Sequence, residues 1–126
     1  MKIGEGFAGH GVNAAHVNTV VGVREGPVGV AWASALASPS QGHTPFVVVV
    51  RPDLPVKPMT LFVNKATIAG ERHGRLTWGA AQAGIAAGVV AALRDDIVRA
   101  EDLCIAAVWV DPAADDEEAV FASNRD

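Results

Sequence analysis

His16 and Asn18 are the residues of this chain whose types and spacing are best suited to chemistry. They lie in the stretch Ala14–Val21, which is otherwise mostly apolar. Alternate side chains of a β-strand point to opposite faces, so the two side chains share one face, about 7 Å apart. A histidine exchanges protons near neutral pH, and an amide both donates and accepts hydrogen bonds. The pair therefore predicts the floor of a site.

A second polar pair occurs in the stretch 62–68. Lys65 and Thr67 are two residues apart there, so as strand residues they share a face, opposite Asn64 and Ala66. Two strands that each present such a pair are typical of a binding site and unusual in a core. We therefore expect Lys65 and Thr67 to belong to the same site as the histidine and its neighbouring amide.

Gln82 is the third polar position that stands out. It falls within an apolar stripe at helical spacing, formed by Trp78, Gln82, Ile85, Val89 and Leu93. A buried glutamine must find hydrogen-bond partners, either in the core or on a ligand. Taken singly, Gln82 is more often a satisfied core amide, His16 a structural histidine and Lys65 a solvated charge. Only the combination favours a site.

The elements that must position these residues follow from periodicity and from turn residues. Strands are expected at 14–21, 44–51, 59–68 and 102–110, and a short strand or arm at 2–9. Helices are expected at 28–38, at 75–94 and from Asp111-Pro112 onward. The run Phe46–Val50 is typical of a strand buried on both faces. The order β-β-α-β-β-α-β-α predicts an α/β fold, specifically an α+β two-layer sandwich with a mixed sheet and helices on one face.

Composition and charge limit the classes of function. The chain has 126 residues, of which 50% are hydrophobic and 19% charged, so a single domain over 1–126 with a substantial core is expected. The formal net charge is -4 and the basic residues are scattered, which argues against a nucleic-acid partner. We expect no membrane span, because the apolar runs are short.

The cysteine, the N-terminus and the histidines indicate a cytoplasmic protein without a bound metal. Cys104 is the single cysteine, it has apolar neighbours, and we expect a buried structural thiol in a reducing compartment. No signal peptide is visible at the N-terminus. The four histidines lack metal-ligand spacing, so no metal site is expected.

The chain resembles the formaldehyde-activating enzyme family over nearly its whole length. The matching stretches are Gly4-Glu5 through Gly11, Ala15-His16, Gly26-Pro27, Gly42 with Thr44, Pro52 through Pro58, Thr60-Leu61, Asn64 through Ile68, and Gly79 through Gln82. The order of P-x-L-P-x-K-P, N-K-x-T and G-x-A-Q is specific. The resemblance implies a carbon–nitrogen lyase of the hydro-lyase type, which condenses formaldehyde with tetrahydromethanopterin to methylene-tetrahydromethanopterin and water.

The resemblance also implies a fold like the second domain of ribosomal protein S5, and a homopentamer with sites between subunits. His16 matches the catalytic proton donor. The positions that match substrate-binding residues are Asn18, Val47, Lys65, Thr67 and Gln82. Tetrahydromethanopterin is a co-substrate, and no tightly bound cofactor is implied. An S5-like fold alone would suggest a nucleic-acid module, but the acidic charge balance argues against it.

The chemistry accounts for these residue types. Formaldehyde and a secondary aromatic amine give a carbinolamine, and a general acid must protonate its oxygen before water can leave. Asn18 stands where the family normally has an aspartate, and a carboxylate would favour the protonated imidazole of His16. Two hypotheses follow. One is an active condensing enzyme, and the other is a non-catalytic paralog that binds a pterin or an aldehyde-derived ligand as a sensor or carrier.

Overall fold

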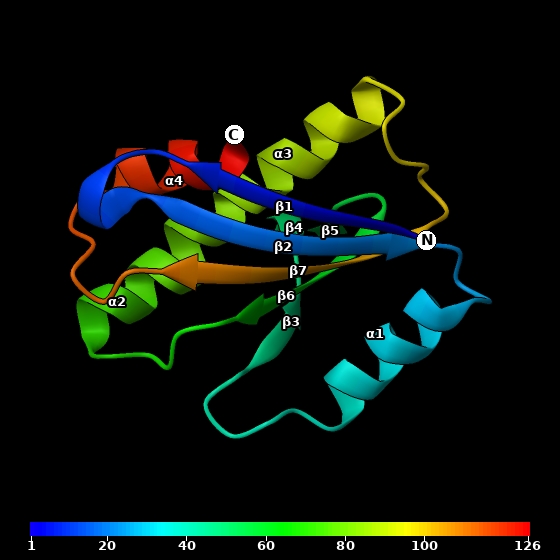
Figure 1. The fold of residues 1–126 in the computed structure, drawn as a ribbon, viewed down its shortest axis with the longest axis horizontal. Coiled ribbons are helices and arrows are strands. Elements are labelled where there is room, and N and C mark those ends of the chain that lie inside the picture. The colour runs from blue at the N-terminus through cyan, green and yellow to red at the C-terminus, as the bar shows by residue number, and fades with distance from the viewer.

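A five-stranded mixed sheet forms the centre of the molecule (Figure 1). The computed structural model describes all of residues 1–126. The strands lie in the order β1 (Lys2–Ala8), β2 (Ala15–Gly22), β7 (Leu103–Val110), β6 (Met59–Asn64) and β3 (Pro45–Val47). β6 and β7 are parallel, and the other neighbouring pairs are antiparallel. The predicted mixed sheet with helices is therefore confirmed.

Helices cover the two faces of the sheet unequally. One face packs against a continuous helical run and against α4 (Glu117–Arg125). The run consists of α2 (Glu71–Arg75), a π-helical segment (Leu76–Ala81) and α3 (Gln82–Arg94). α1 (Pro27–Ala37) lies apart from these helices (Figure 1). It packs on the opposite face against β2, β7 and β3, and Val28 lies against Gly22. The rest of that opposite face carries no helix, and we call it the open face.

The core lies between the helix-covered face and the helical run. Phe62 and Val108 from the sheet, Leu76 and Ile85 from the helical run, and Val120 from α4 are all buried there. Burial of such side chains contributes roughly 1.5–3 kcal/mol each, so this layer dominates the stability of the fold. The sheet is therefore a rigid support for polar groups on its open face.

The helical run Glu71–Arg94 is longer than the predicted helix over 75–94. Its 24 residues are apolar enough, by length and composition alone, to cross a membrane, so the expectation that every apolar run is too short does not hold here. Leu76, Ala81 and Ile85 of this run belong to the core. The same composition is thus explained by packing against the sheet and α4.

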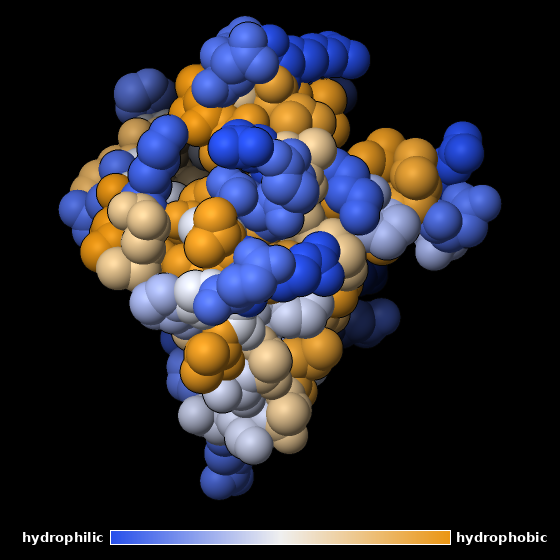
Figure 2. Space-filling view, turned by 90° about the vertical axis from the view of Figure 1, so that its right-hand side faces the viewer, coloured by the Kyte–Doolittle hydropathy of each residue, from blue (hydrophilic) through white to orange (hydrophobic).

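Small residues on α3 allow it to approach α4 closely. A Cβ added at Gly84 would lie 2.4 Å from the carbonyl oxygen of Phe121, and one added at Gly88 would lie 2.8 Å from that of Arg125. The outer surface is mixed. Figure 2 shows apolar and hydrophilic patches side by side, and exposed large apolar side chains include Met1, Ile3, Phe7, Val30 and Ile97.

The composition of the valine run predicted one strand buried on both faces, and this prediction is wrong. β3 ends at Val47, the Val48 amide donates to the Thr60 carbonyl at 2.8 Å, and the chain then leaves the sheet. Val49–Arg51 (β4) pairs instead with Leu54–Pro55 (β5), and Val50 is 53% exposed. The prolines that follow the run cannot donate to a central ladder, so the segment folds back on itself.

The final helix begins at Glu117, and the prediction that it begins at Asp111-Pro112 is wrong. Asp116 is the N-cap and accepts a hydrogen bond from the Ala119 amide at 3.1 Å. The Asp111 carboxylate accepts from the Ala113 amide in a turn. Asn13 explains the later start, because its Oδ1 accepts from the amides of Asp115 and Asp116 and holds that segment out of the helix.

Candidate functional site

The hairpin of β1 and β2 places four polar or aromatic side chains on the open face. Glu5 lies opposite Asn18 in the strand register, and Phe7 lies opposite His16. Because alternate strand residues face opposite ways, Val17 turns toward the core. The prediction that His16 and Asn18 share a face is confirmed. The Phe7 ring stacks on the imidazole, with centroids 4.1 Å apart and planes 6° from parallel.

Glu5 connects the two predicted residues. Its Oε2 accepts hydrogen bonds from His16 Nε2 and from Asn18 Nδ2, each at 3.1 Å. These hydrogen bonds, with that from Asn18 the stronger influence, hold the pKa of the Glu5 carboxyl below its usual range. The side chain is therefore a carboxylate near neutral pH, although it is about half exposed.

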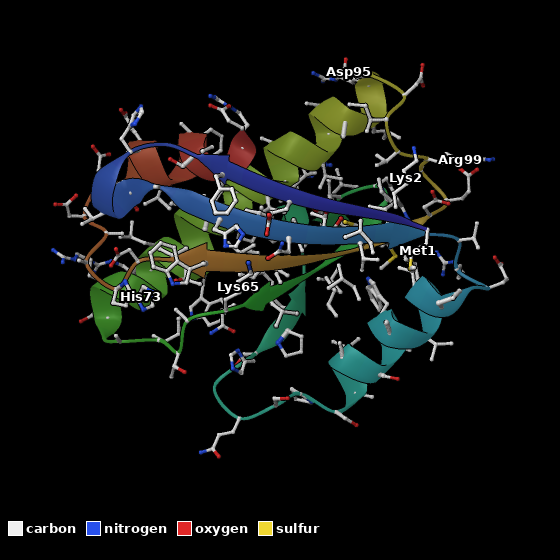
Figure 3. The ribbon with its side chains drawn as sticks, in the orientation of Figure 1. Met1, Lys2, Lys65, His73, Asp95 and Arg99 are labelled. Atoms are coloured by element: carbon white, nitrogen blue, oxygen red, sulfur yellow. The ribbon has the colours of Figure 1, made fainter.

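Lys65 reaches the same group from the end of β6. The backbone amide of Lys65 donates to the Val108 carbonyl at 2.8 Å, which fixes its position beside β7. Its Nζ lies 3.3 Å from His16 Nδ1 and also contacts Asn18 Oδ1. Figure 3 shows Lys65 on the side of the sheet turned toward the viewer. The structure therefore brings three of the predicted site residues together.

These contacts define how protons are arranged around the imidazole. With Lys65 as an ammonium ion, it donates to His16 Nδ1, and Nε2 carries the ring proton that it donates to Glu5. Burial lowers the pKa of Lys65, and the negative charge of Glu5 opposes that shift. A lysine that gives up its proton more readily can pass it to the imidazole. The arrangement can thus deliver a proton through His16.

A cavity of about 330 Å³ opens beside these residues. It is lined by Phe7, Ala14, Ala15, His16, Lys65 and Trp109. Two aromatic rings next to a proton donor suit a flat, ring-shaped ligand. A larger hollow of about 470 Å³ lies between β1 and α3, and its wall is mainly apolar. We assign the site to the smaller cavity, because the His16 imidazole and the Lys65 amine line that cavity and not the larger hollow.

The sequence predicted that Thr67 shares a strand face with Lys65, and this prediction is wrong. β6 ends at Asn64, and Thr67 is exposed in the following loop, against Gly42. The Asn64 side chain explains the end of the strand. Its Nδ2 donates to the carbonyls of Ala66 and Gly42, and its Oδ1 accepts from the Thr44 amide. These bonds turn the chain away from the ladder.

Val47 and Gln82 also lie apart from the histidine. Val47 pairs with Leu61 on β6, so its side chain points away from the core that contains Phe46 and Phe62, but it lies two strands beyond β7. Gln82 lies on the first turn of α3, which packs against the helix-covered face, and its Oε1 accepts from the Val49 amide at 2.7 Å. Within one chain, Gln82 is thus a hydrogen-bonded amide on the core side, as expected for this glutamine when it is considered singly.

Glu5 and Phe7 are site residues that the sequence interpretation missed. The spacing of two residues between them, on a strand expected at 2–9, was the available signal. His73 is different, because it is 2% exposed and fully used by the fold. Its Nε2 donates to the Val110 carbonyl, and its Nδ1 accepts from the Ala69 amide. No group of three or more potential metal ligands comes together in the structure.

Comparison with known proteins supplies an independent observation. The family model described as "Formaldehyde-activating enzyme (Fae)" matches residues 3–126. Three curated relatives, each named "Bifunctional enzyme Fae/Hps", match 98% of this chain. The protein of Methanococcoides burtonii is 40% identical, that of Methanosphaera stadtmanae 38%, and that of Archaeoglobus fulgidus 36%. The chain spans about a third of the length of these relatives, 32%, 31% and 32% respectively.

Proposed function

Because the chain belongs to the formaldehyde-activating enzyme family, we propose that it condenses formaldehyde with tetrahydromethanopterin to give methylene-tetrahydromethanopterin and water. This makes it a carbon–nitrogen lyase of the hydro-lyase type. The observation that carries the proposal is the position of the His16 imidazole at a cavity wall, between the Glu5 carboxylate and the Lys65 amine. The relatives are named as enzymes, which favours catalysis over a sensor or carrier role.

His16 acts as the general acid in the first half of the reaction. A pterin N–H adds across the C=O bond of formaldehyde. A C–N bond forms, the C=O π bond breaks, and the proton that the nitrogen loses goes to the oxygen to give a carbinolamine. Hydroxide is a poor leaving group, so His16 first protonates the carbinolamine oxygen. The C–O bond then breaks, water departs, and an iminium cation remains. Proton transfer by a positioned side chain typically contributes about 10²–10⁴ in rate.

The second half of the reaction returns the proton. A second pterin nitrogen attacks the iminium carbon and forms the second C–N bond, and the proton that this nitrogen releases goes to the imidazole. Lys65 supports the cycle, because its amine shares a hydrogen bond with His16 Nδ1 and can restore the proton there. The cavity holds both reactants at the same place, which adds the benefit of proximity.

The pterin is held by residues that one chain does not gather. Asn18 and Lys65 lie at the histidine, whereas Val47, Thr67 and Gln82 lie elsewhere on the surface or toward the helix-covered side. A site formed between copies of the chain, in a homopentamer, would unite them. The open face and the exposed Ile3 and Phe7 of the edge strand β1 offer the apolar surface for such an assembly. Light scattering at micromolar concentration tests this, and a monomer would contradict it.

The activity is tested by mixing the purified chain with formaldehyde and tetrahydromethanopterin and following methylene-tetrahydromethanopterin. The expected result is formation above the spontaneous rate, in proportion to the amount of protein. Tetrahydrofolate in the same assay checks which reduced pterin is used. A rate equal to the spontaneous one, with a folded and assembled protein, would overturn the proposal. We expect a cytoplasmic protein, in keeping with small soluble reactants.

A further inference from the structure

The Glu5 carboxylate contacts His16 and Asn18 at once. One oxygen, Oε2, accepts from both side chains at 3.1 Å, and the backbone register places Glu5 directly opposite Asn18. The position is fixed by strand pairing and does not depend on a flexible loop. Glu5 is also the acidic side chain that forms an ion pair with His16 when the ring is protonated.

We propose that Glu5 is a positioning residue that supplies the negative charge of the His16 site from β1, where Asn18 supplies none. This inference rests on the proposed function and deepens it. Glu5 holds the imidazole by its Nε2–H and leaves Nδ1 facing Lys65. It also stabilises positive charge at the ring when the proton returns. Asn18, which is neutral, then serves as a bridge between Glu5 and Lys65.

The balance of charge at this site supports the assignment. With a neutral imidazole, the Glu5 carboxylate and the Lys65 ammonium cancel. The other residue beside His16 in the ladder is Trp109 of β7, which carries no charge. Asn18 donates to the anion through Nδ2 and accepts from the cation through Oδ1, so its amide matches both neighbours. Without Glu5, the site would hold a cation and no anion.

The first test replaces the charge and keeps the shape. Glu5→Gln retains an oxygen that can accept from His16 but removes the negative charge. We expect kcat to fall about tenfold, which corresponds to about 1.4 kcal/mol of lost stabilisation, and KM for the pterin to change much less. The alkaline limb of the kcat profile should move to lower pH, because the charge that favours the protonated ring is gone.

Matched controls separate this role from a structural one. Glu25→Gln removes the same charge from an exposed turn beyond the other end of β2, and it should leave kcat, KM and the pH profile unchanged. The thermal midpoint of Glu5→Gln should equal that of the unchanged protein, since Glu5 is half exposed. A loss of kcat without any movement of the pH profile would overturn the proposal.

The second test moves the carboxylate instead of removing it. In the double variant Glu5→Gln with Asn18→Asp, the negative charge returns on β2, beside Lys65 and His16. We expect it to recover most of the kcat that Glu5→Gln loses and to bring the alkaline limb back. If the double variant is no better than Glu5→Gln, the site needs Glu5 for some reason other than its charge, and the proposal fails.

A measurement without substrate distinguishes failure of this inference from failure of the proposed function. The ring resonances of His16, identified by their loss in His16→Gln, are followed by NMR while pH is varied. In Glu5→Gln the change from imidazolium to imidazole should occur at a lower pH than in the unchanged protein, because a nearby negative charge favours the protonated ring. That shift would support the role of Glu5 even if no condensation were detected. An unchanged titration would overturn it even in an active enzyme.

Discussion

Lys65 Nζ lies 3.3 Å from His16 Nδ1, so a residue beyond the end of β6 shares a hydrogen bond with a residue on β2, two strands away. One proton can occupy either nitrogen of this pair. Both residues line the cavity, so the pair offers a proton donor and a neighbouring amine that can supply the proton again.

His16→Ala should lower the condensation rate by about 10²–10⁴ and leave pterin affinity within a few-fold. The physical reason is that the imidazole at the cavity wall is the general acid proposed to protonate the carbinolamine oxygen. Initial rates and equilibrium binding of the pterin measure the two effects. His10→Ala, which removes a histidine from an exposed turn, is the control and should behave like the unchanged protein. A loss smaller than about tenfold would make His16 a structural residue.

Two substitutions should separate the contributions of Lys65 to the reaction, namely its positive charge and its exchangeable proton. Lys65→Met removes both, so we expect weaker pterin binding and a kcat lower by about 10² or more. Lys65→Arg keeps the positive charge but cannot release a proton at ordinary pH. It should preserve much of the binding while kcat falls as in Lys65→Met. Steady-state kcat and KM check this, and a fully active Lys65→Arg would show that Lys65 contributes charge alone.

Gln82 has a structural role that can be distinguished from a role in binding. Gln82→Ala leaves the Val49 amide without its acceptor, and we expect a loss of about 1–3 kcal/mol in the free energy of unfolding. Gln82→Glu keeps an acceptor for that amide but loses the amide N–H groups available to a ligand. It should therefore be nearly as stable as the unchanged protein and bind pterin more weakly. Equal pterin affinity in all three proteins would exclude Gln82 from the site.

The sequence predicted those features of the site that depend on one segment alone. Strand alternation was sufficient to place His16 and Asn18 on one face, because both belong to β2. Alternation could not assign Glu5 to them, because that contact depends on the register between two strands. The register follows from the whole hairpin and its packing.

Other errors arose where a contact between distant parts of the sequence decides the outcome. Thr67 was expected on a strand face, but the hydrogen bonds of the Asn64 side chain with Gly42 and Thr44 end the strand first. Asp111 and Asp116 are both suitable helix caps by type, and Asn13, about a hundred residues earlier, determines which of them is used. Local propensity does not include such contacts, so these errors occur at segment ends.

Cys104 should make the stability of the protein fall at alkaline pH. Burial raises the pKa of its thiol from 9.0 to about 11, while a hydrogen bond with Thr60 opposes the shift. Between these two values the unfolded chain loses the thiol proton and the native protein keeps it, so the unfolded state binds fewer protons. Stability from this group is complete below pH 9.0 and is lost as pH rises toward about 11.

The expected size of that loss is roughly 2–3 kcal/mol, since each unit of pKa corresponds to about 1.4 kcal/mol. Urea unfolding at several pH values measures it, and the chain has no tyrosine to titrate in the same range. The quantity to compare is the difference between the unchanged protein and Cys104→Ala, because contributions from the other ionisable groups cancel in that difference. That difference should shrink or reverse between pH 9 and 11. A constant difference across the range would mean that the thiol ionises equally easily in both states, against its burial at 4% exposure.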